Sequence, residues 1–253
     1  MNFNIFRFAS LDSTNTEAIN QAKLGADEGL CIIARQQTAG RGRFGRTWIS
    51  EKDAGLYLSV VLRPGFEVRF LPLITLMAGV AVFDTLREHG LKPDIKWVND
   101  ILIGEKKISG ILAETVETSK GLAVVVGIGI NVKSANFPPG IAEIATSIQS
   151  ETGSIINAED LANTLTRFLG YYYAILSGEA GREAILAQWQ RRSSYFSGKS
   201  VRVVLENDVV TGMTDGLENN GALRVKTDKG EIRIVQAGDV ENLKFASSFS
   251  PIS

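Results

Sequence analysis

The stretch GRGRFGRTW, residues 40–48, combines three arginines with three glycines. No acidic residue lies between Arg35 and Ser50 to balance the guanidinium groups. A guanidinium group offers paired donors that match a carboxylate or a phosphate, and glycine lets the backbone approach a ligand closely. The stretch is therefore either a solvated flexible loop or an anion-binding loop. The close spacing of its arginines favours anion binding.

Two glycines in an apolar strand form a second candidate site. Gly127 and Gly129 interrupt the run GLAVVVGIGINV, residues 121–132. Side chains alternate along a strand, so glycines two residues apart lie on one face. Glycine weakens a strand unless something must lie against its backbone, so the pair predicts a flat ligand there. The pair is no dinucleotide-binding motif, because a third glycine and a following helix are missing.

Polar residues beside a predicted hairpin form a third candidate. The segment 94–114 reads as a β-hairpin that turns at GEKK, residues 104–107. The polar residues beside this turn are Lys96, Asn99, Asp100, Lys106 and Lys107. A lysine at such a place is usually a plain surface charge. Against this, the ND pair interrupts an apolar region, and Gly110 allows a ligand to approach the strand that bears it.

Ser13, Thr14 and Asn15 lie at the start of a predicted helix. Thr14 and Glu17 have the spacing of a capping box, so a purely structural role as a helix cap is open. A helix start also presents free N–H groups and small polar side chains, which can hold a ligand.

The chain offers little for nucleophilic catalysis. Its one cysteine, Cys31, lies in an apolar strand, and its one histidine, His89, ends a predicted helix beside Gly90. These positions favour a buried thiol and a helix-end charge over a catalytic pair. An arginine loop, a glycine-lined strand and a lysine hairpin suit a reaction in which the substrates attack each other. The protein then positions them and neutralises charge, as in phosphoryl or nucleotidyl transfer.

Length and composition set broad limits. The chain has 253 residues and a formal net charge of -1, which fits a large domain with a small one and argues against a general nucleic-acid binder. A single cysteine points to the reducing cytoplasm. The N-terminus lacks the features of a signal peptide, and no stretch approaches the roughly 20 apolar residues of a membrane span.

Hydrophobic spacing predicts an α+β fold. Strands are expected at 3–8, 30–35, 55–62 and 121–132, and helices at 14–24, 71–89, 158–177 and 180–192. Residues 133–148 read as a loop. From Gly198 onward the period becomes alternating, in four short strands at 200–206, 209–217, 222–227 and 231–236. These strands predict a small β-barrel or sandwich that packs on its neighbour.

The chain resembles the biotin protein ligases. The segments STN, GRGRFGRTW, KWVNDILI, KKISGILAE and GIGIN occur in the order and spacing of that family, over essentially the whole chain. The resemblance implies a mixed-sheet catalytic domain related to class II aminoacyl-tRNA synthetases, residues 1–195. It also implies an SH3-like β-barrel at residues 196–253.

The resemblance implies a two-step activity that uses ATP and Mg²⁺. Biotin is activated as biotinyl-5′-AMP and is then transferred to a lysine of a biotin carboxyl carrier domain. In the family the arginine loop is disordered when empty and closes over biotin and the adenylate. Binding would then supply the counter-charge that the arginines lack.

The resemblance also assigns roles to residues. Lys107 would bridge the biotin carboxylate and the α-phosphate, with Arg43, Asn99 and Asp100 at the reacting end, and Asp100 could hold a metal or meet the acceptor lysine. The residues expected to bind biotin are Ser13, Thr14, Asn15, Gln37, Gly40, Arg41, Gly42, Arg43, Lys107, Gly110, Leu112, Gly127 and Gly129. The residues expected to bind ATP are Arg41, Arg43, Trp48, Lys107 and Asn131.

Two other functions stay open at this point. A lipoate ligase shares the fold and the adenylating chemistry, although the arginine loop favours biotin. An RNA-binding module would also use an arginine loop and a small barrel, but the net charge counts against it. Some family members carry an N-terminal winged helix, and because this chain begins at the predicted catalytic strand we expect no DNA binding. We expect no membrane partner either, and an oligomer is possible.

Overall fold

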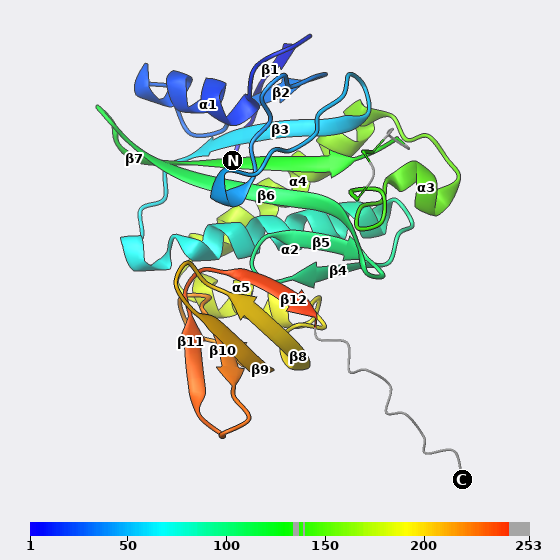
Figure 1. The fold of residues 1–253 in the computed structure, drawn as a ribbon. Helices are drawn as coiled ribbons and strands as arrows, with labels where there is room; N and C mark the ends of the chain where they lie inside the picture. Colours follow the sequence, from blue (N-terminus) through cyan, green and yellow to red (C-terminus); the bar gives the residue numbers. More distant parts are fainter. Residues whose placement is uncertain (134–136, 139, 243–253) are drawn as a thin grey trace.

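A computed structural model describes residues 1–133, 137–138 and 140–242, and it contains two sheets (Figure 1). The larger sheet has seven strands, of which β1 and β2 are parallel and all other neighbours antiparallel. In spatial order they are β1 (Asn4–Phe8), β2 (Leu30–Ala34), β3 (Gly55–Leu62), β7 (Gly121–Asn131), β6 (Lys106–Thr118), β5 (Asp100–Ile103) and β4 (Pro93–Lys96).

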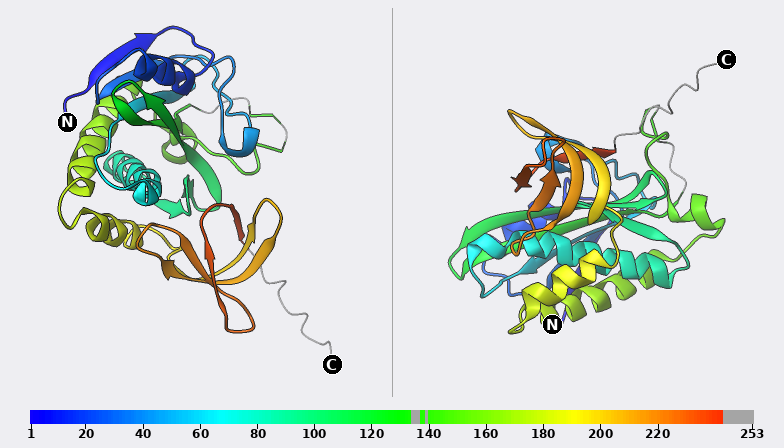
Figure 2. Two further views of the ribbon diagram at one scale, coloured as in Figure 1. Left: turned by 90° about the vertical axis from the view of Figure 1, so that its left-hand side faces the viewer. Right: turned by 90° about the horizontal axis from the view of Figure 1, so that it is seen from below.

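Helices cover the two faces of this sheet unequally (Figure 2). They are α1 (Thr14–Lys23), α2 (Pro72–Glu88), α3 (Ile148–Thr152), α4 (Ala158–Leu176) and α5 (Gly181–Gln190). Helices α2, α4 and α5 share the main core with one face of the sheet. Helix α1 packs on the other face through Ala18 and Ala22.

Alternation along β7 explains this division. Val124, Val126 and the isoleucines that follow point into the main core, whereas Ala123 and Val125 pack under α1. Gly127 and Gly129 continue the row under α1. The α1 face of β7 is therefore apolar where the helix covers it and bare backbone beyond the helix.

Helix α2 corrects one expectation. Within the segment Val68–Glu88, a window of 18 residues has a mean hydropathy of 1.6, so the segment is long and apolar enough to cross a membrane, contrary to our expectation from the sequence. In the fold, 67% of this window is buried inside the protein. Leu73, Ile74 and Met77, for example, are fully buried, so the segment serves as the central core helix.

The smaller sheet contains five antiparallel strands. Its order is β11 (Ile232–Val235), β10 (Leu223–Lys226), β9 (Val209–Leu217), β8 (Ser197–Val204) and β12 (Asp239–Asn242). It packs on the main core, and the buried Trp97 donates its indole N–H to the carbonyl of Gly221 at 3.0 Å. Closure of this sheet into a barrel and a domain boundary at 195/196 stay predictions.

Most element positions agree with the sequence pattern, with three differences. The predicted hairpin strand before Gly104 is two strands, β4 and β5, with a turn at residues 97–99 between them. The N-cap of α1 is Ser13 and not Thr14, because the Ser13 side chain accepts from the Thr16 N–H while the Thr14 hydroxyl points towards Gln37. Helix α3 and strand β12 were not predicted, since both are too short to show a hydrophobic period. Residues 134–136 and 139 of the predicted loop lie outside the described residues.

A buried ion pair ties three helices together. Arg192, just after α5, donates to Asp84 of α2 at 3.0 and 2.8 Å, and Tyr172 of α4 donates to the same carboxylate. The side chains of Arg192 and Asp84 are 13% and 6% exposed. The carboxylate is thus almost fully removed from water and depends on these partners.

We predict that Arg192→Met lowers the free energy of unfolding by about 3–5 kcal/mol, because it leaves a buried carboxylate without its cation. Urea denaturation at neutral pH would measure the loss. Arg167→Met is the control, since its pair with Glu88 is about half exposed and should contribute no more than about 1 kcal/mol. Equal losses in the two variants would show that burial does not set the strength of these pairs.

Burial also determines the reactivity of the Cys31 thiol. It raises the pKa of this thiol to about 12, so the thiolate is scarce at pH 8. We predict that the native protein does not react with a thiol reagent at that pH, whereas the urea-unfolded chain takes up one equivalent. Rapid reaction of the native protein would show that β2 opens readily.

Candidate functional site

The floor of the candidate site is made by two pairs of opposed residues on β6 and β7. Gly110 lies opposite Gly129, and Leu112 lies opposite Gly127. A Cβ atom at Gly127 would lie 2.1 Å from Asn15 Oδ1, and one at Gly129 would lie 2.5 Å from the Trp48 indole. Both glycines are needed because these two side chains lie directly on the strand backbone.

Hydrogen bonds fix the wall of the site at the start of α1. The Asn15 amide nitrogen donates to Glu114 at 2.7 Å and to the Leu112 carbonyl at 3.2 Å, and its oxygen accepts from Ser59 at 2.6 Å. The backbone N–H and the hydroxyl of Thr14 both donate to Gln37 Oε1, at 2.8 and 3.1 Å. The segment STN therefore caps the helix through Ser13 and turns Thr14 and Asn15 to the site.

A β-bulge brings Lys107 to the same face as Gly110. Strict alternation would put residues three apart on opposite faces. Ile101 pairs with Ser109 whereas Leu102 pairs with Lys107, so β6 holds one extra residue at this point. Ile108 and Ile111 consequently both point into the main core, and Lys107 and Gly110 both face the site. Lys106 is exposed and does not line the site.

Charged and polar groups gather around Lys107. Its ammonium group lies 2.6 Å from Asp100 Oδ1 and 5.4 Å from the centre of the Trp48 ring. Arg43 donates to Asn99 Oδ1 at 3.0 Å, and Asn99 in turn donates to the Ile111 carbonyl at 3.1 Å. Burial lowers the pKa of the Arg43 guanidinium, which means that the charge sits where water is scarce.

The three arginines of the loop all have partners inside the protein, contrary to our expectation that a ligand supplies the only counter-charge. Arg41 forms two bonds of 2.9 and 2.7 Å to Glu114 of β6. Arg43 bonds to Asn99 and to a carbonyl oxygen next to β12. Arg46 pairs with Asp239 of β12. The acidic partners of Arg41 and Arg46 are distant in sequence, so the local run of arginines gave no sign of them.

The loop also has internal structure. Residues Arg43–Gly45 form a 3₁₀ turn, the Gly42 N–H donates to the Arg46 carbonyl at 2.7 Å, and the Trp48 N–H donates to the Gly40 carbonyl at 2.9 Å. A Cβ atom at Gly40 would lie 2.4 Å from the Trp48 carbonyl oxygen. Gly40 therefore closes the base of the loop and does not itself line the site.

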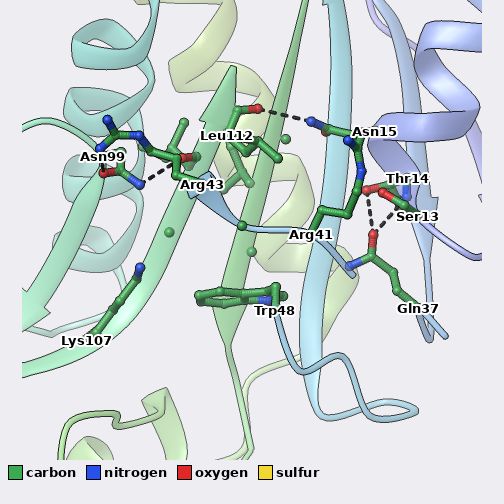
Figure 3. A pocket seen from close by; sticks show the side chains of 16 residues that line it. Ser13, Thr14, Asn15, Gln37, Arg41, Arg43, Trp48, Asn99, Lys107 and Leu112 are labelled. Carbon is green, nitrogen blue, oxygen red and sulfur yellow. Dashed lines mark hydrogen bonds between the residues drawn. The ribbon is translucent and has the colours of Figure 1, made fainter. Parts of the chain in front are cut away.

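Two neighbouring cavities meet at this point. The first, which we call the slot, lies over the glycine floor and has a volume of about 60 Å³ (Figure 3). The second, which we call the outer cavity, has a volume of about 550 Å³ and extends to Asp239 of the smaller sheet. Gly42, Arg43, Trp48, Asn99 and Lys107 line both cavities.

The predicted site residues divide between the cavities. The slot also contains Ser13, Thr14, Asn15, Gln37, Arg41, Gly110, Leu112, Gly127 and Gly129. The outer cavity also contains Asp100 and Asn131. Asn131 is buried and donates its amide to the Thr146 carbonyl at 3.0 Å. The sequence therefore identified side chains that the fold brings together.

Trp48 fills the slot. Figure 3 shows its ring across the floor, between Lys107 on one side and Gln37 on the other. Its indole N–H is buried and has no hydrogen-bond partner among the described residues. A volume of 60 Å³ is far below the roughly 300–1,000 Å³ of typical small-molecule sites, so a ligand needs this ring to move.

Sequence reasoning missed several residues of the site. Ser59, Glu114 and Asp239 hold Asn15, Arg41 and Arg46, but each is an ordinary polar residue in a predicted strand or near the C-terminus. An acid at alternating spacing from Gly110 was the one available signal for Glu114, since Gly110, Leu112 and Glu114 share a face.

The residues present do not form a metal cage. The part of the chain that the structure describes has no group of three or more histidine, cysteine or acidic side chains that could hold an ion. The predicted ligand Asp100 is already paired with Lys107.

Comparisons with known proteins agree with this geometry. Residues 7–131 match the model of the biotin/lipoate A/B protein ligase family, and residues 196–241 match the biotin protein ligase C-terminal domain. The chain is 35% identical to the bifunctional ligase/repressor BirA of Bacillus subtilis, a match that covers 91% of this chain and 71% of that protein.

Two further relatives match over nearly their full length. The biotin–[acetyl-CoA-carboxylase] ligase of Paracoccus denitrificans is 31% identical over 92% of this chain and 98% of its own. The biotin protein ligase of Aquifex aeolicus, solved in complex with biotin and ATP, is 29% identical and superposes with a TM-score of 0.81, covering 94% of this chain and 97% of that one. The chain belongs to the biotin protein ligase family.

Proposed function

We propose that this chain joins biotin to a lysine of a biotin carboxyl carrier domain, in two steps that use ATP. The observation that carries the proposal is the junction of the two cavities. Lys107 and Arg43 line both the slot and the outer cavity, so a carboxylate in one and a phosphate in the other would meet between two cations. Biotin would occupy the slot, and ATP the outer cavity.

The slot suits a ring that carries a urea group. Asn15 presents an amide oxygen that is oriented through Glu114 and Ser59, and Thr14, whose hydroxyl proton is donated to Gln37, presents an oxygen that can accept from a urea N–H. The bare backbone of Gly127 and Gly129 offers a flat surface for the ring. We assign the biotin ring to this end and its carboxylate to the end beside Lys107.

In the first step a carboxylate oxygen of biotin attacks the α-phosphorus of ATP. The new oxygen–phosphorus bond forms as the bond to the bridging oxygen breaks, and pyrophosphate leaves with that electron pair. Two anions must approach within bonding distance, and the ammonium of Lys107 and the guanidinium of Arg43 offset their repulsion. Magnesium would accompany ATP as its phosphate complex.

In the second step the amine of the acceptor lysine attacks the carbonyl carbon of biotinyl-5′-AMP, and AMP leaves. The amine must lose a proton, and Asp100 is the carboxylate that lines the outer cavity beside the junction. It lies 2.6 Å from Lys107, so an acceptor amine that reaches Lys107 also comes within reach of this carboxylate as a proton acceptor. The acceptor would arrive through the outer cavity, which is the larger of the two.

A lipoate ligase is the alternative on the same fold. The matches to biotin ligases favour biotin. Pyrophosphate release from ATP in the presence of biotin or of lipoate tests the proposal directly. Release with lipoate alone would overturn it. A cytoplasmic location and an oligomeric state belong to the proposal only as expectations.

We predict that Lys107→Ala slows formation of biotinyl-5′-AMP by roughly 10²–10³-fold, as expected for loss of one charge-stabilising group. Biotin binding without ATP should weaken much less, because the other wall of the slot is intact. Pre-steady-state pyrophosphate release would measure the rate. Lys106→Ala is the matched control and should have the wild-type rate, since its side chain is exposed on the other side of the strand. The assignment is wrong if Lys106→Ala slows adenylate formation and Lys107→Ala keeps the wild-type rate.

We predict that biotin displaces the Trp48 ring from the slot. The chain has three tryptophans, and Trp97 and Trp189 are only 2% and 0% exposed in the core, so a change in emission on adding biotin should come from Trp48. Trp48→Phe should lose the change, and Trp48→Ala should bind biotin with a faster association rate. An unchanged emission response in Trp48→Phe would show that the ring is not the group that moves.

A further inference from the structure

A second lysine lies in the outer cavity and has no part in the mechanism above. Lys96 ends β4 and lies opposite Asp100 in the register of β4 and β5. Its neighbour Ile95 is fully buried in the main core, so alternation turns Lys96 to the opposite face. Lys96 lines the outer cavity and does not line the slot.

The surroundings of Lys96 are unusual for an ammonium group. Among the described residues, no carboxylate lies within ion-pair distance of Lys96, and its side chain makes no hydrogen bond. Burial lowers its pKa, and the charge of Lys107 acts in the same direction, while Asp100, Asp239 and Glu241 oppose the shift. Lys96 is half-buried, and a partly desolvated charge without a direct partner is costly, which points to an anion that arrives with a ligand.

Neighbouring charges do not cancel that of Lys96. The carboxylate of Asp100 is in contact with Lys107, that of Asp239 with Arg46, and that of Glu241 with Arg202. These three pairs are neutral as units. The outer cavity therefore keeps a positive centre at Lys96, in addition to Arg43 at the junction with the slot.

The in-line geometry of the displacement at phosphorus indicates which part of ATP would lie near Lys96. In phosphoryl and nucleotidyl transfer the attacking and leaving oxygens lie roughly in line with the phosphorus. On the proposed function, the attacking carboxylate comes from the slot. The leaving group must then point away from the slot, into the part of the outer cavity that Lys96 lines but the slot does not share.

We propose that Lys96 binds the β- and γ-phosphates of ATP and stabilises the pyrophosphate that leaves in the first step. Negative charge grows on the bridging oxygen as its bond to the α-phosphorus breaks, and the ammonium of Lys96 offsets it. The second step releases AMP and involves no pyrophosphate, so Lys96 has no role in it. This inference rests on the proposed function, and it separates the two lysines, because Lys107 meets the α-phosphate and Lys96 the leaving group.

The test uses Lys96→Met, which keeps the apolar stem of the side chain and removes the charge, with Lys106→Met as the matched control. Three measurements are needed: the affinity for inorganic pyrophosphate without biotin, the rate of biotin-dependent exchange between ATP and labelled pyrophosphate, and the rate of transfer from supplied biotinyl-5′-AMP to a carrier domain. We expect Lys96→Met to weaken pyrophosphate binding at least tenfold and to slow exchange by about 10²-fold. Transfer from supplied adenylate should stay within about twofold of the wild type, and Lys106→Met should match the wild type in all three.

Other outcomes separate the alternatives. Slower transfer from supplied adenylate with normal exchange would show that Lys96 acts in the step with the acceptor lysine, and it would overturn the inference. An equal loss of exchange and of transfer would also overturn it. If Lys96→Met does not fold, Lys96→Arg should retain pyrophosphate binding while Lys96→Gln loses it, and equal binding by these two would overturn the inference. A wild-type chain that binds pyrophosphate through Lys96 but shows no biotin-dependent exchange would contradict the proposed function and leave Lys96 as an anion site.

Discussion

The alternation of side chains along β7 is the constraint on which the site depends. One face of this strand is apolar along its whole length and holds the main core. The other face changes character at the N-terminal end of α1, from Ala123 and Val125 to Gly127 and Gly129. Because the two faces are independent, the strand can be rigid on the core side and still offer bare backbone to a ligand. The side chains around the site are positioned relative to this surface.

A second property of the site is that two of the three loop arginines already have acidic partners before any ligand arrives. Arg41 is held by Glu114 of the larger sheet and Arg46 by Asp239 of the smaller sheet. The loop therefore joins the two sheets through ion pairs at its two ends. These pairs are partly exposed, so each contributes little to stability and can be exchanged for a ligand phosphate at small cost. Weak ion pairs suit a loop that must close over a ligand and later release it.

Much of the fold was predictable because it follows from hydrophobic period. Helix α4 shows its helical period clearly, and helix α2 and strand β7 are recognised as long apolar runs, while the paired glycines of β7 identify its site face. The proximity of Lys107 and Gly110 was not predictable from spacing, since it needs the bulge in β6. The partners of the loop arginines also could not be found, because contacts such as Arg41–Glu114 join residues 73 positions apart. Local patterns report which face a residue occupies, but they do not report which distant residue covers that face.

The Trp48 ring in the slot has a consequence for equilibrium measurements. Because the ring must move before a ligand can enter, biotin would bind only those molecules of the empty protein whose ring lies outside the slot. The apparent dissociation constant is then the intrinsic constant divided by the fraction of molecules with the ring outside. If that fraction were about one in a hundred, the measured affinity would be about 100-fold weaker than the contacts in the slot alone would provide. Residues that position the ring without lining the slot, such as Gly40 at the base of the loop, would thereby set the affinity for biotin as strongly as residues that touch it.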